Sequence, residues 1–343
     1  MSLLCDLTGP GHLWERPELT VWHRATVKAL GQVDPSLGAP LEGDPLLREC
    51  LADLLRVRYE RIVVTAGIRA AVGPLLREMD EVLVERPTFR GVLTAMRRER
   101  LRVRTDSWER MIDAGADTDG GALWFTAPCR NPDGRRVDAR FVAAVGAAAE
   151  QGRRVVCNTA YRWFAPVPDL SEAVLTAGTL HKLAGRGARL GWVIAVSRDG
   201  EMLPALAASA PSLHWQRAWA HFLIDGGADL LLRRHQQLDA ARAAFFAALD
   251  MPNVATGQEG PNILIPVAMP EPEAVARLAA AGVRASPGIA FNAWQPSVRV
   301  CLTQISPAVA AQAGARVAEV LAEARSADEP RPPASAGADA GPG

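Results

Sequence analysis

Lysine is almost absent from this chain of 343 residues: only Lys28 and Lys182 occur among its 38 basic residues, and the other 36 are arginines. Arginine keeps its proton in proteins, whereas a buried lysine can lose its proton and act as a nucleophilic amine. Each remaining lysine is therefore a candidate for chemistry that arginine cannot perform. The alternative is that two lysines remain by chance.

Net charge and long apolar runs are also absent. The 38 basic residues are balanced by 38 acidic ones, so there is no overall basic field to attract nucleic acid or an anionic membrane. A basic run at residues 97–104 fits the solvated face of an edge strand. No apolar stretch reaches the roughly 18 residues of a membrane span, and the first residues lack a signal-peptide pattern. We therefore expect a cytoplasmic protein that binds neither nucleic acid nor a membrane.

Paired cysteines are missing as well. The five cysteines are odd in number, widely spaced and free of any CxxC motif, which argues against a disulfide framework and against a zinc site. We expect no metal site, and we expect the thiols to be reduced and mostly buried. The cysteines are Cys5, Cys50, Cys129, Cys157 and Cys301.

Between residues 46 and 196, short β-branched runs alternate with segments of helical periodicity. This alternation predicts an α/β fold, with a large domain built on a mostly parallel sheet that is flanked by helices. In such sheets, ligands bind at the carboxyl ends of the strands. The predicted strands are 61–65, 81–85, 101–104, 122–126, 154–157, 173–176 and 192–196, and the predicted helices are 46–55, 70–79, 91–98 and 138–151.

A second pattern follows and predicts a smaller α+β domain. It contains expected helices at 230–249, 273–281 and 307–324 and expected strands at 262–267 and 298–302. The resulting division is an N-terminal segment at 1–35 that belongs to the small domain, a large domain at 36–235, a small C-terminal domain at 236–326, and a tail at 327–343. The tail is rich in Pro, Ala and Gly and is expected to be disordered.

Short motifs follow the predicted strands of the large domain, and one more lies in the small domain. In order, they are Thr65-Ala-Gly67, Glu85-Arg-Pro-Thr-Phe-Arg-Gly91, Asn131-Pro-Asp-Gly134, Asn158-Thr-Ala-Tyr161, Thr179-Leu-His-Lys-Leu-Ala-Gly-Arg-Gly-Ala-Arg-Leu-Gly-Trp192 and Val298-Arg-Val300. Each motif alone is common. Together, over residues 36 to 325, they resemble the fold-type I pyridoxal 5′-phosphate enzymes of the class I/II aminotransferase group. The third and fifth motifs are spelled most like the alliinase and tryptophan aminotransferase branch.

The resemblance implies an aspartate aminotransferase-like fold, a homodimer, an α-amino acid as the small-molecule substrate and pyridoxal 5′-phosphate as the cofactor. It makes Lys182 the residue that forms a Schiff base with the cofactor and then removes the Cα proton. Asn131 and Tyr161 would bind the oxygen on the cofactor ring, Phe89 would stack on the ring, and Arg299 would clamp the substrate carboxylate. Taken singly, Phe89 could be a core residue, Arg299 a surface charge and Asn131 a turn former.

The resemblance also implies a phosphate site. Arg189 would pair with the phosphate together with the Thr179 hydroxyl and the backbone N–H groups of Gly67, Ile68 and Arg69 at a helix N-terminus.

The chain departs from the family pattern in three places. Asn158 stands where the family has the aspartate that keeps the ring nitrogen protonated, and a neutral amide lacks that charge. His181 replaces a serine that is frequent beside the lysine; it could contact the phosphate, relay a proton or simply be packed. The N-terminal segment is short, which would thin the wall of the substrate pocket.

Three functions remain open from the sequence. The first is an aminotransferase that works through Lys182. The second is a β-eliminating lyase or β-replacement enzyme, which Asn158 favours because a leaving group can take up the electrons. The third is a cofactor-binding homologue with weak catalysis that acts as a scaffold or regulator.

Overall fold

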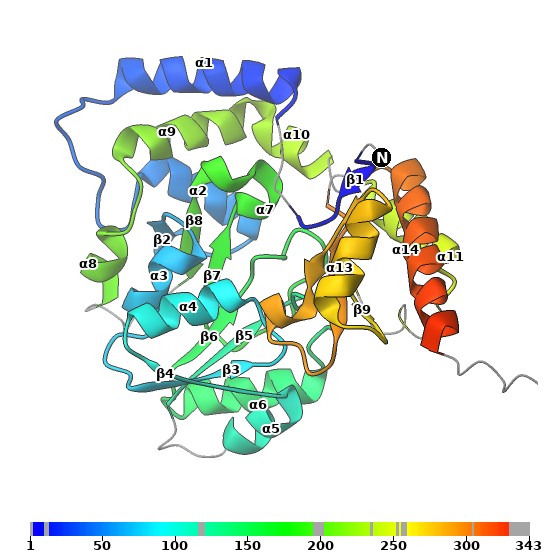
Figure 1. The fold of residues 1–343 in the computed structure, drawn as a ribbon. Helices are drawn as coiled ribbons and strands as arrows, with labels where there is room; N and C mark the ends of the chain where they lie inside the picture. Colours follow the sequence, from blue (N-terminus) through cyan, green and yellow to red (C-terminus); the bar gives the residue numbers. More distant parts are fainter. Residues whose placement is uncertain are drawn as a thin grey trace, which may run out of the picture.

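The chain forms a large domain around a seven-stranded sheet and a smaller domain beside it (Figure 1). The computed structural model describes residues 3–9, 14–115, 121–194, 202–233, 236–251, 254, 259–303 and 305–328. Within these ranges, no helix combines the length and the apolarity that a membrane crossing requires.

The seven-stranded sheet has the order β2-β8-β7-β6-β5-β3-β4, and β8 is its antiparallel member. The other six strands run in one direction, so their carboxyl ends meet at one edge. This confirms the expected mostly parallel sheet. Its strands are β2 (Ile62–Thr65), β3 (Glu81–Glu85), β4 (Arg102–Asp106), β5 (Ala122–Thr126), β6 (Val155–Asn158), β7 (Leu175–Thr179) and β8 (Gly191–Ile194).

Helices cover both faces of this sheet, which is why its strands are almost continuously apolar. In β3, Val82 and Val84 pack toward α3 and α4, whereas Leu83 packs toward α5 and α6. One face carries α3 (Ile68–Leu75), α4 (Arg90–Arg98) and α8 (Met202–Ala207), and the other carries α2 (Pro45–Leu55), α5 (Trp108–Gly115), α6 (Ala139–Glu150) and α9 (Leu213–Phe222).

Helix α1 (Arg16–Gln32) lies along α9 on the outside of the large domain (Figure 1). Trp14 and Trp22 pack among Trp215, Trp219 and Phe222 of α9, with ring centroids 4.8–5.8 Å apart. Aromatic packing of this kind stabilises a helix whose own sequence is largely polar. A five-residue π-helical turn at Leu223–Gly227 joins α9 to α10 (Ala228–Arg233).

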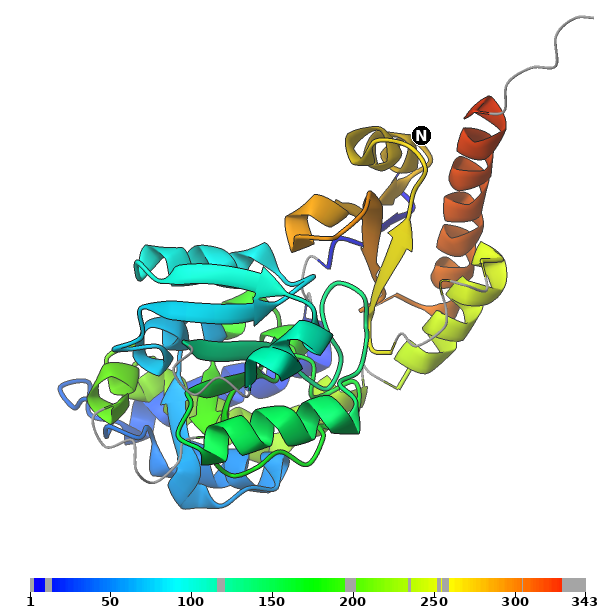
Figure 2. The ribbon, with the colours of Figure 1, turned by 90° about the horizontal axis from the view of Figure 1, so that it is seen from below.

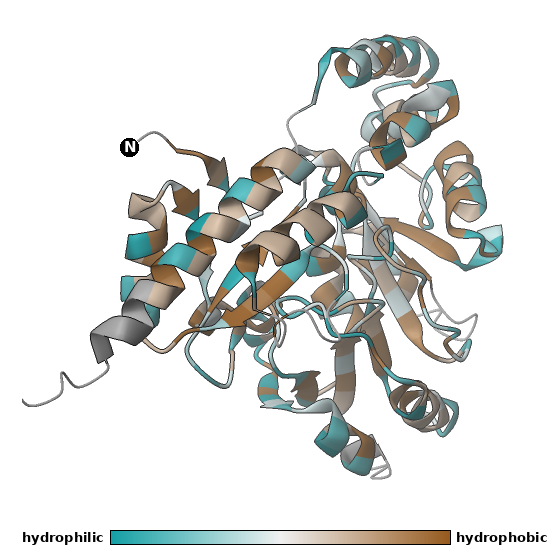
Figure 3. Cartoon of the chain, turned by 90° about the vertical axis from the view of Figure 1, so that its right-hand side faces the viewer, coloured by the Kyte–Doolittle hydropathy of each residue, from teal (hydrophilic) through white to brown (hydrophobic). Residues whose placement is uncertain are grey.

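The small domain combines a three-stranded antiparallel sheet, of order β11-β12-β9, with a parallel pair formed by β1 and β10. Helices α11 and α14 lie side by side on it (Figure 2). Its helices carry both apolar and polar residues (Figure 3), and the buried apolar side chains form one core. Its elements are β1 (Cys5–Asp6), α11 (Leu238–Leu249), β9 (Asn262–Pro266), α13 (Glu271–Ala280), β10 (Val283–Arg284), β11 (Ser286–Pro287), β12 (Ser297–Cys301) and α14 (Pro307–Asp328). This confirms the expected smaller α+β domain.

Several boundaries differ from those predicted. The single helix expected at 230–249 is two helices, α10 and α11, and the helix expected at 70–79 ends at Leu75. The sequence did not reveal α1. The chain from β1 to α1 contacts both domains, because β1 pairs with β10 in the small domain and α1 packs on α9 in the large domain. The domain limits themselves stay predictions. Residues 195–196 of an expected strand and residues 329–343 of the expected tail lie outside the described residues.

Two smaller predictions hold. The basic run ends in β4, an edge strand, where exposed Arg102 and Arg104 both pair with Glu81. All five cysteines are free thiols, and four of them are buried.

Candidate active site

Lys182 lies in the short helix α7 (His181–Ala184), which begins just past the carboxyl end of β7. Thr179 fixes this turn, because its hydroxyl donates to the Leu190 carbonyl (3.0 Å) and accepts from the His181 backbone N–H (3.1 Å). The amine of Lys182 lies 5.1 Å from the centroid of the Tyr161 ring, which is held just past the end of β6. Two residues that the sequence places 21 positions apart are therefore neighbours.

A small cavity of about 30 Å³ opens between the two domains at this point. The large domain contributes Tyr161, His181 and Lys182 to its wall. The N-terminal segment and the small domain contribute Thr8, Gly9, Arg299, Cys301 and Thr303. The structure thus brings four of the predicted site residues around one cavity: Tyr161, His181, Lys182 and Arg299.

Arg299 is a buried cation with an unused donor. It lies in β12 with 6% of its surface exposed, and one of its terminal nitrogens donates to the Thr8 carbonyl at 3.3 Å. Its guanidinium carbon lies 4.5 Å from the centroid of the Phe291 ring, and its Nε has no hydrogen-bond partner among the described residues. A buried charge with an unpaired donor is costly unless an anion pairs with it. Arg299 is therefore suited to receive a carboxylate in this cavity.

Phe89 does not line the cavity. It precedes α4 with 45% of its surface exposed, and its ring centroid lies 6.2 Å from that of Phe291. Phe291 thus neighbours both Phe89 and Arg299, and the predicted stacking role of Phe89 stays a prediction.

The backbones at Gly67 and Gly191 approach each other closely, beside the Thr179 hydroxyl that fixes the turn before Lys182. Gly67 precedes α3 with a φ of 111°, and its N–H donates to the Thr65 hydroxyl at 3.2 Å. A Cβ on Gly191 would come within 2.6 Å of the Gly67 Cα, and a Cβ on Gly67 would lie 3.6 Å from the Thr179 hydroxyl. The close approach of these backbones leaves a side-chain-free cradle at the N-terminus of α3, where backbone N–H groups favour an anion. Ile68, which is buried, and Arg69, which is exposed, begin that helix.

The charges around this cradle are positive. Burial, together with the nearby positive charges of Lys182, Arg186 and Arg69, lowers the pKa of His181 to about 4. A neutral imidazole surrounded by cations is the environment expected beside a bound anion, which would reverse the shift. Arg189 is exposed and holds a left-handed backbone (φ 40°), so its predicted contact with a phosphate stays a prediction.

Asn158 ends β6, between β5 and β7. Its side-chain oxygen accepts a hydrogen bond from the Ala160 N–H at 3.0 Å, which closes a local turn. The carbonyl is therefore already engaged, and the amide N–H₂ is the part of the side chain left to meet a ligand. Asn158 thus offers a hydrogen-bond donor where an aspartate would offer a negative charge.

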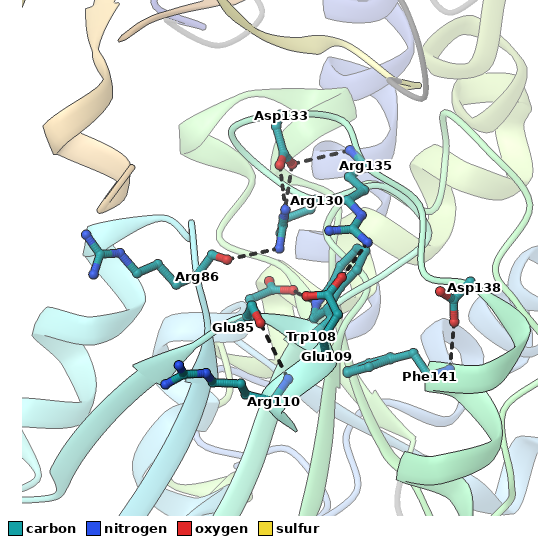
Figure 4. Close-up of polar contacts among 11 residues, drawn as sticks. Glu85, Arg86, Trp108, Glu109, Arg110, Arg130, Asp133, Arg135, Asp138 and Phe141 are labelled. Carbon is teal, nitrogen blue, oxygen red and sulfur yellow. Dashed lines mark hydrogen bonds and ion pairs between the residues drawn. The ribbon is translucent and has the colours of Figure 1, made fainter. Parts of the chain in front are cut away.

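Asn131 is held by a network that the sequence did not reveal. Its buried side-chain oxygen has no partner in the part of the chain that the structure describes. The preceding Arg130 makes a two-point ion pair with Asp133 (3.0 and 2.5 Å) and also donates to the Arg86 carbonyl at 3.2 Å (Figure 4). This arrangement fixes the turn that carries Asn131.

Glu85 lies close to that network at the end of β3. It is fully buried and accepts a hydrogen bond from the Trp108 indole at 2.8 Å (Figure 4). Burial raises its pKa to about 7, against the opposing effect of the positive charge on Arg130. An acidic residue that follows three apolar residues at the end of the strand is the sequence signal that could have pointed to it.

The residues present fit pyridoxal phosphate. The cavity has a lysine amine, and the neighbouring cradle has backbone donors and positive charges for a phosphate. Asn131 and Arg299 each keep a buried polar atom that no described residue pairs. This donor set matches an anionic, aldehyde-bearing cofactor and a carboxylate substrate.

Searches with the sequence found no matching family model and no matching curated protein. Solved structures do match. They include LysN, the α-aminoadipate aminotransferase of Thermus thermophilus, with a TM-score of 0.80 and 19% identity over 95% of this chain and 93% of that one. The multiple substrate aminotransferase of Thermococcus profundus matches with a TM-score of 0.77 and 19% identity, over 95% and 93%. Aspartate aminotransferase of Thermus thermophilus with maleate matches with a TM-score of 0.75 and 24% identity, over 93% and 92%. The chain therefore has the aspartate aminotransferase-like fold of fold type I.

Proposed function

We propose that this protein is a pyridoxal phosphate-dependent aminotransferase that acts on an α-amino acid through Lys182. The observation that carries the proposal is that the Lys182 amine and the buried guanidinium of Arg299, with a donor that no described residue pairs, line the same cavity. The similar solved structures are named as aminotransferases for aspartate, α-aminoadipate and multiple substrates, which supports the reaction class.

Each residue has a distinct task in this proposal. When bound, the cofactor would supply a ring that accepts the electron pair left on the substrate Cα. Arg299 binds the substrate carboxylate and so places Cα near Lys182, whose amine moves the proton at that carbon. Tyr161 and Asn131 hold the ring oxygen, and Phe89 covers the ring. The phosphate is held by Gly67, Ile68, Arg69, Thr179, His181 and Arg189.

Asn158 supports a second candidate, a β-eliminating or β-replacing lyase. With its oxygen engaged by Ala160, it donates to the ring nitrogen and so favours the unprotonated ring, which accepts electrons less well. When the substrate has a leaving group on Cβ, the departing group takes up those electrons. The spelling of the Lys182 segment, which resembles the alliinase and tryptophan aminotransferase branch, agrees with this candidate.

A single turnover without a second substrate separates the two candidates. Transamination yields a keto acid and leaves the amino group on the cofactor. Elimination yields a keto acid and free ammonia and leaves the cofactor aldehyde intact. Keto acid formation by neither route, across a panel of amino acids and with full cofactor occupancy, would contradict the aminotransferase and the eliminating lyase. β-Replacement releases no keto acid and is tested by adding a nucleophile and measuring the new amino acid, whose absence would contradict it.

We also propose a homodimer with the active site at the subunit interface, as the resemblance implies. Apolar side chains are exposed on α1, among them Leu19, Val27 and Leu30. Light scattering of the cofactor-loaded protein should give twice the chain mass of 36.7 kDa, and a monomer of that mass would contradict the proposal. The cytoplasmic location stays a prediction.

A further inference from the structure

Tryptophan side chains donate hydrogen bonds to the segment that carries Lys182. The Trp14 indole N–H donates to the Ala184 carbonyl at 2.7 Å. The indoles of Trp215 and Trp219 both donate to the Ala188 carbonyl, at 2.8 and 3.1 Å. Both acceptors lie within six residues of Lys182, on its C-terminal side.

The carbonyls of Ala184 and Ala188 need hydrogen-bond partners from outside their own segment. Gly185 has a φ of 84° and Arg189 a φ of 40°, and between them the backbone forms a single 3-10 turn at Arg186–Ala188. Carbonyls in such a turn lack the ladder partners that a helix or strand would provide. The indole donors supply those partners, and their rigid rings hold few rotamers, so the turn is fixed at little cost in side-chain entropy.

The tryptophan rings that donate these hydrogen bonds also pack together in one cluster. Trp219 packs against Trp14 and Trp22 with ring centroids 5.8 and 4.8 Å apart, and Trp22 packs against Trp215 at 5.1 Å. The cluster joins α9 to the residues just before α1. Six positions before Trp14, Thr8 accepts the hydrogen bond of Arg299.

We propose that Trp14, Trp215 and Trp219 are positioning residues that set the place of the Lys182 amine. They touch neither substrate nor cofactor and act through the carbonyls of Ala184 and Ala188. The inference rests on the proposed role of Lys182 and assigns to the tryptophan cluster a task beyond filling the core.

Phenylalanine substitutions test this, because they keep an aromatic ring and remove the indole donor. The test variants are Trp14→Phe and the double variant Trp215→Phe/Trp219→Phe. The matched controls are the wild type and Trp124→Phe, since the Trp124 indole is buried in a different core from residues 183–190 and donates to no partner within the described ranges.

The first readout is backbone hydrogen exchange of residues 183–190 in the cofactor-free protein. Each lost hydrogen bond should raise exchange there by about 2- to 10-fold relative to the controls. Exchange that matches the controls would overturn the proposal, and this outcome does not depend on Lys182 binding a cofactor.

The second readout is the split between kcat and KM in the loaded enzyme. Because Arg299 is untouched, the test variants should lose kcat by about 2- to 10-fold per lost bond and keep KM for the amino acid, whereas the controls keep both. Unchanged kcat with increased exchange would overturn the positioning role. Failure of borohydride to fix the cofactor on Lys182 in the wild type would instead mark failure of the proposed function.

Discussion

Replacing Arg299 tests how the substrate is held. In the structure, Arg299 is 6% exposed, and its guanidinium donates one hydrogen bond to the Thr8 carbonyl. Its Nε has no partner among the described residues. An exposed ion pair contributes at most about 1 kcal/mol, whereas loss of one partner from a buried charge pair costs about 2–5 kcal/mol. Because Arg299 is buried, the larger cost applies to it. Arg299→Ala should therefore lower kcat/KM for the amino acid by about 30- to 5,000-fold.

The assay compares an amino acid with the corresponding amine that lacks the carboxylate. Arg299→Ala should lower kcat/KM for the amino acid far more than for the amine, and the cofactor dissociation constant should stay near that of the wild type. Equal losses for both substrates would refute the reasoning. Cofactor loss with unchanged kinetics would show that Arg299 holds the cofactor instead.

Arg299→Met separates this effect from unfolding. Methionine fills part of the same volume without burying a charge, and replacing buried charges with apolar groups is frequently neutral or stabilising. Denaturant unfolding of the cofactor-free protein should therefore give an unfolding free energy equal to or above that of the wild type. A large destabilisation would mean that the guanidinium is paired in the free protein.

Three further outcomes follow from Asn158, His181 and Glu85. Asn158→Asp should raise transamination relative to elimination, because each unit of increase in the pKa of the ring nitrogen is worth about 1.4 kcal/mol; an unchanged ratio of amine-form cofactor to ammonia would contradict this. Inorganic phosphate should raise the pKa of His181 from about 4 in an NMR titration, and no change on adding phosphate would remove His181 from the anion site. Without the anion, the lowered pKa of His181 should reduce the unfolding free energy as pH falls from 6.5 toward 4, because the unfolded chain then binds more protons. The pH dependence that comes from Glu85 has the opposite sign. Because its pKa is about 7 in the fold and 4.5 in the unfolded chain, the unfolding free energy should fall by about 3 kcal/mol as pH rises between those values. Glu85→Gln should remove that pH dependence, and identical profiles for variant and wild type would contradict the raised pKa.

The sequence predicted the part of the site that strand order determines. Lys182 and Tyr161 follow neighbouring parallel strands of the sheet, so their proximity needs only the alternation of strands and helices. The rarity of lysine in the composition pointed to Lys28 and Lys182 alike, and only the motif around Lys182 distinguished the two; the catalytic role of Lys182 stays a prediction.

Contacts across long sequence separations were beyond the sequence. Thr8 meets Arg299 across 291 positions, and Trp14 meets Ala184 across 170. No local pattern encodes such pairs, since each depends on how the two domains and α1 pack. Helix α1 escaped prediction for the same reason, because its stability comes from the aromatic rings of α9 more than from its own periodicity.

The central claim is that Lys182 carries the cofactor, and the chain offers a natural control because its other lysine, Lys28, is exposed on α1. Borohydride reduction of the cofactor-loaded protein, followed by peptide mapping, should place the label on the peptide that contains Lys182. Lys182→Ala should abolish both the label and turnover while the fold is retained, and Lys28→Arg should preserve both. A label on Lys28, or turnover that survives in Lys182→Ala, would contradict the account.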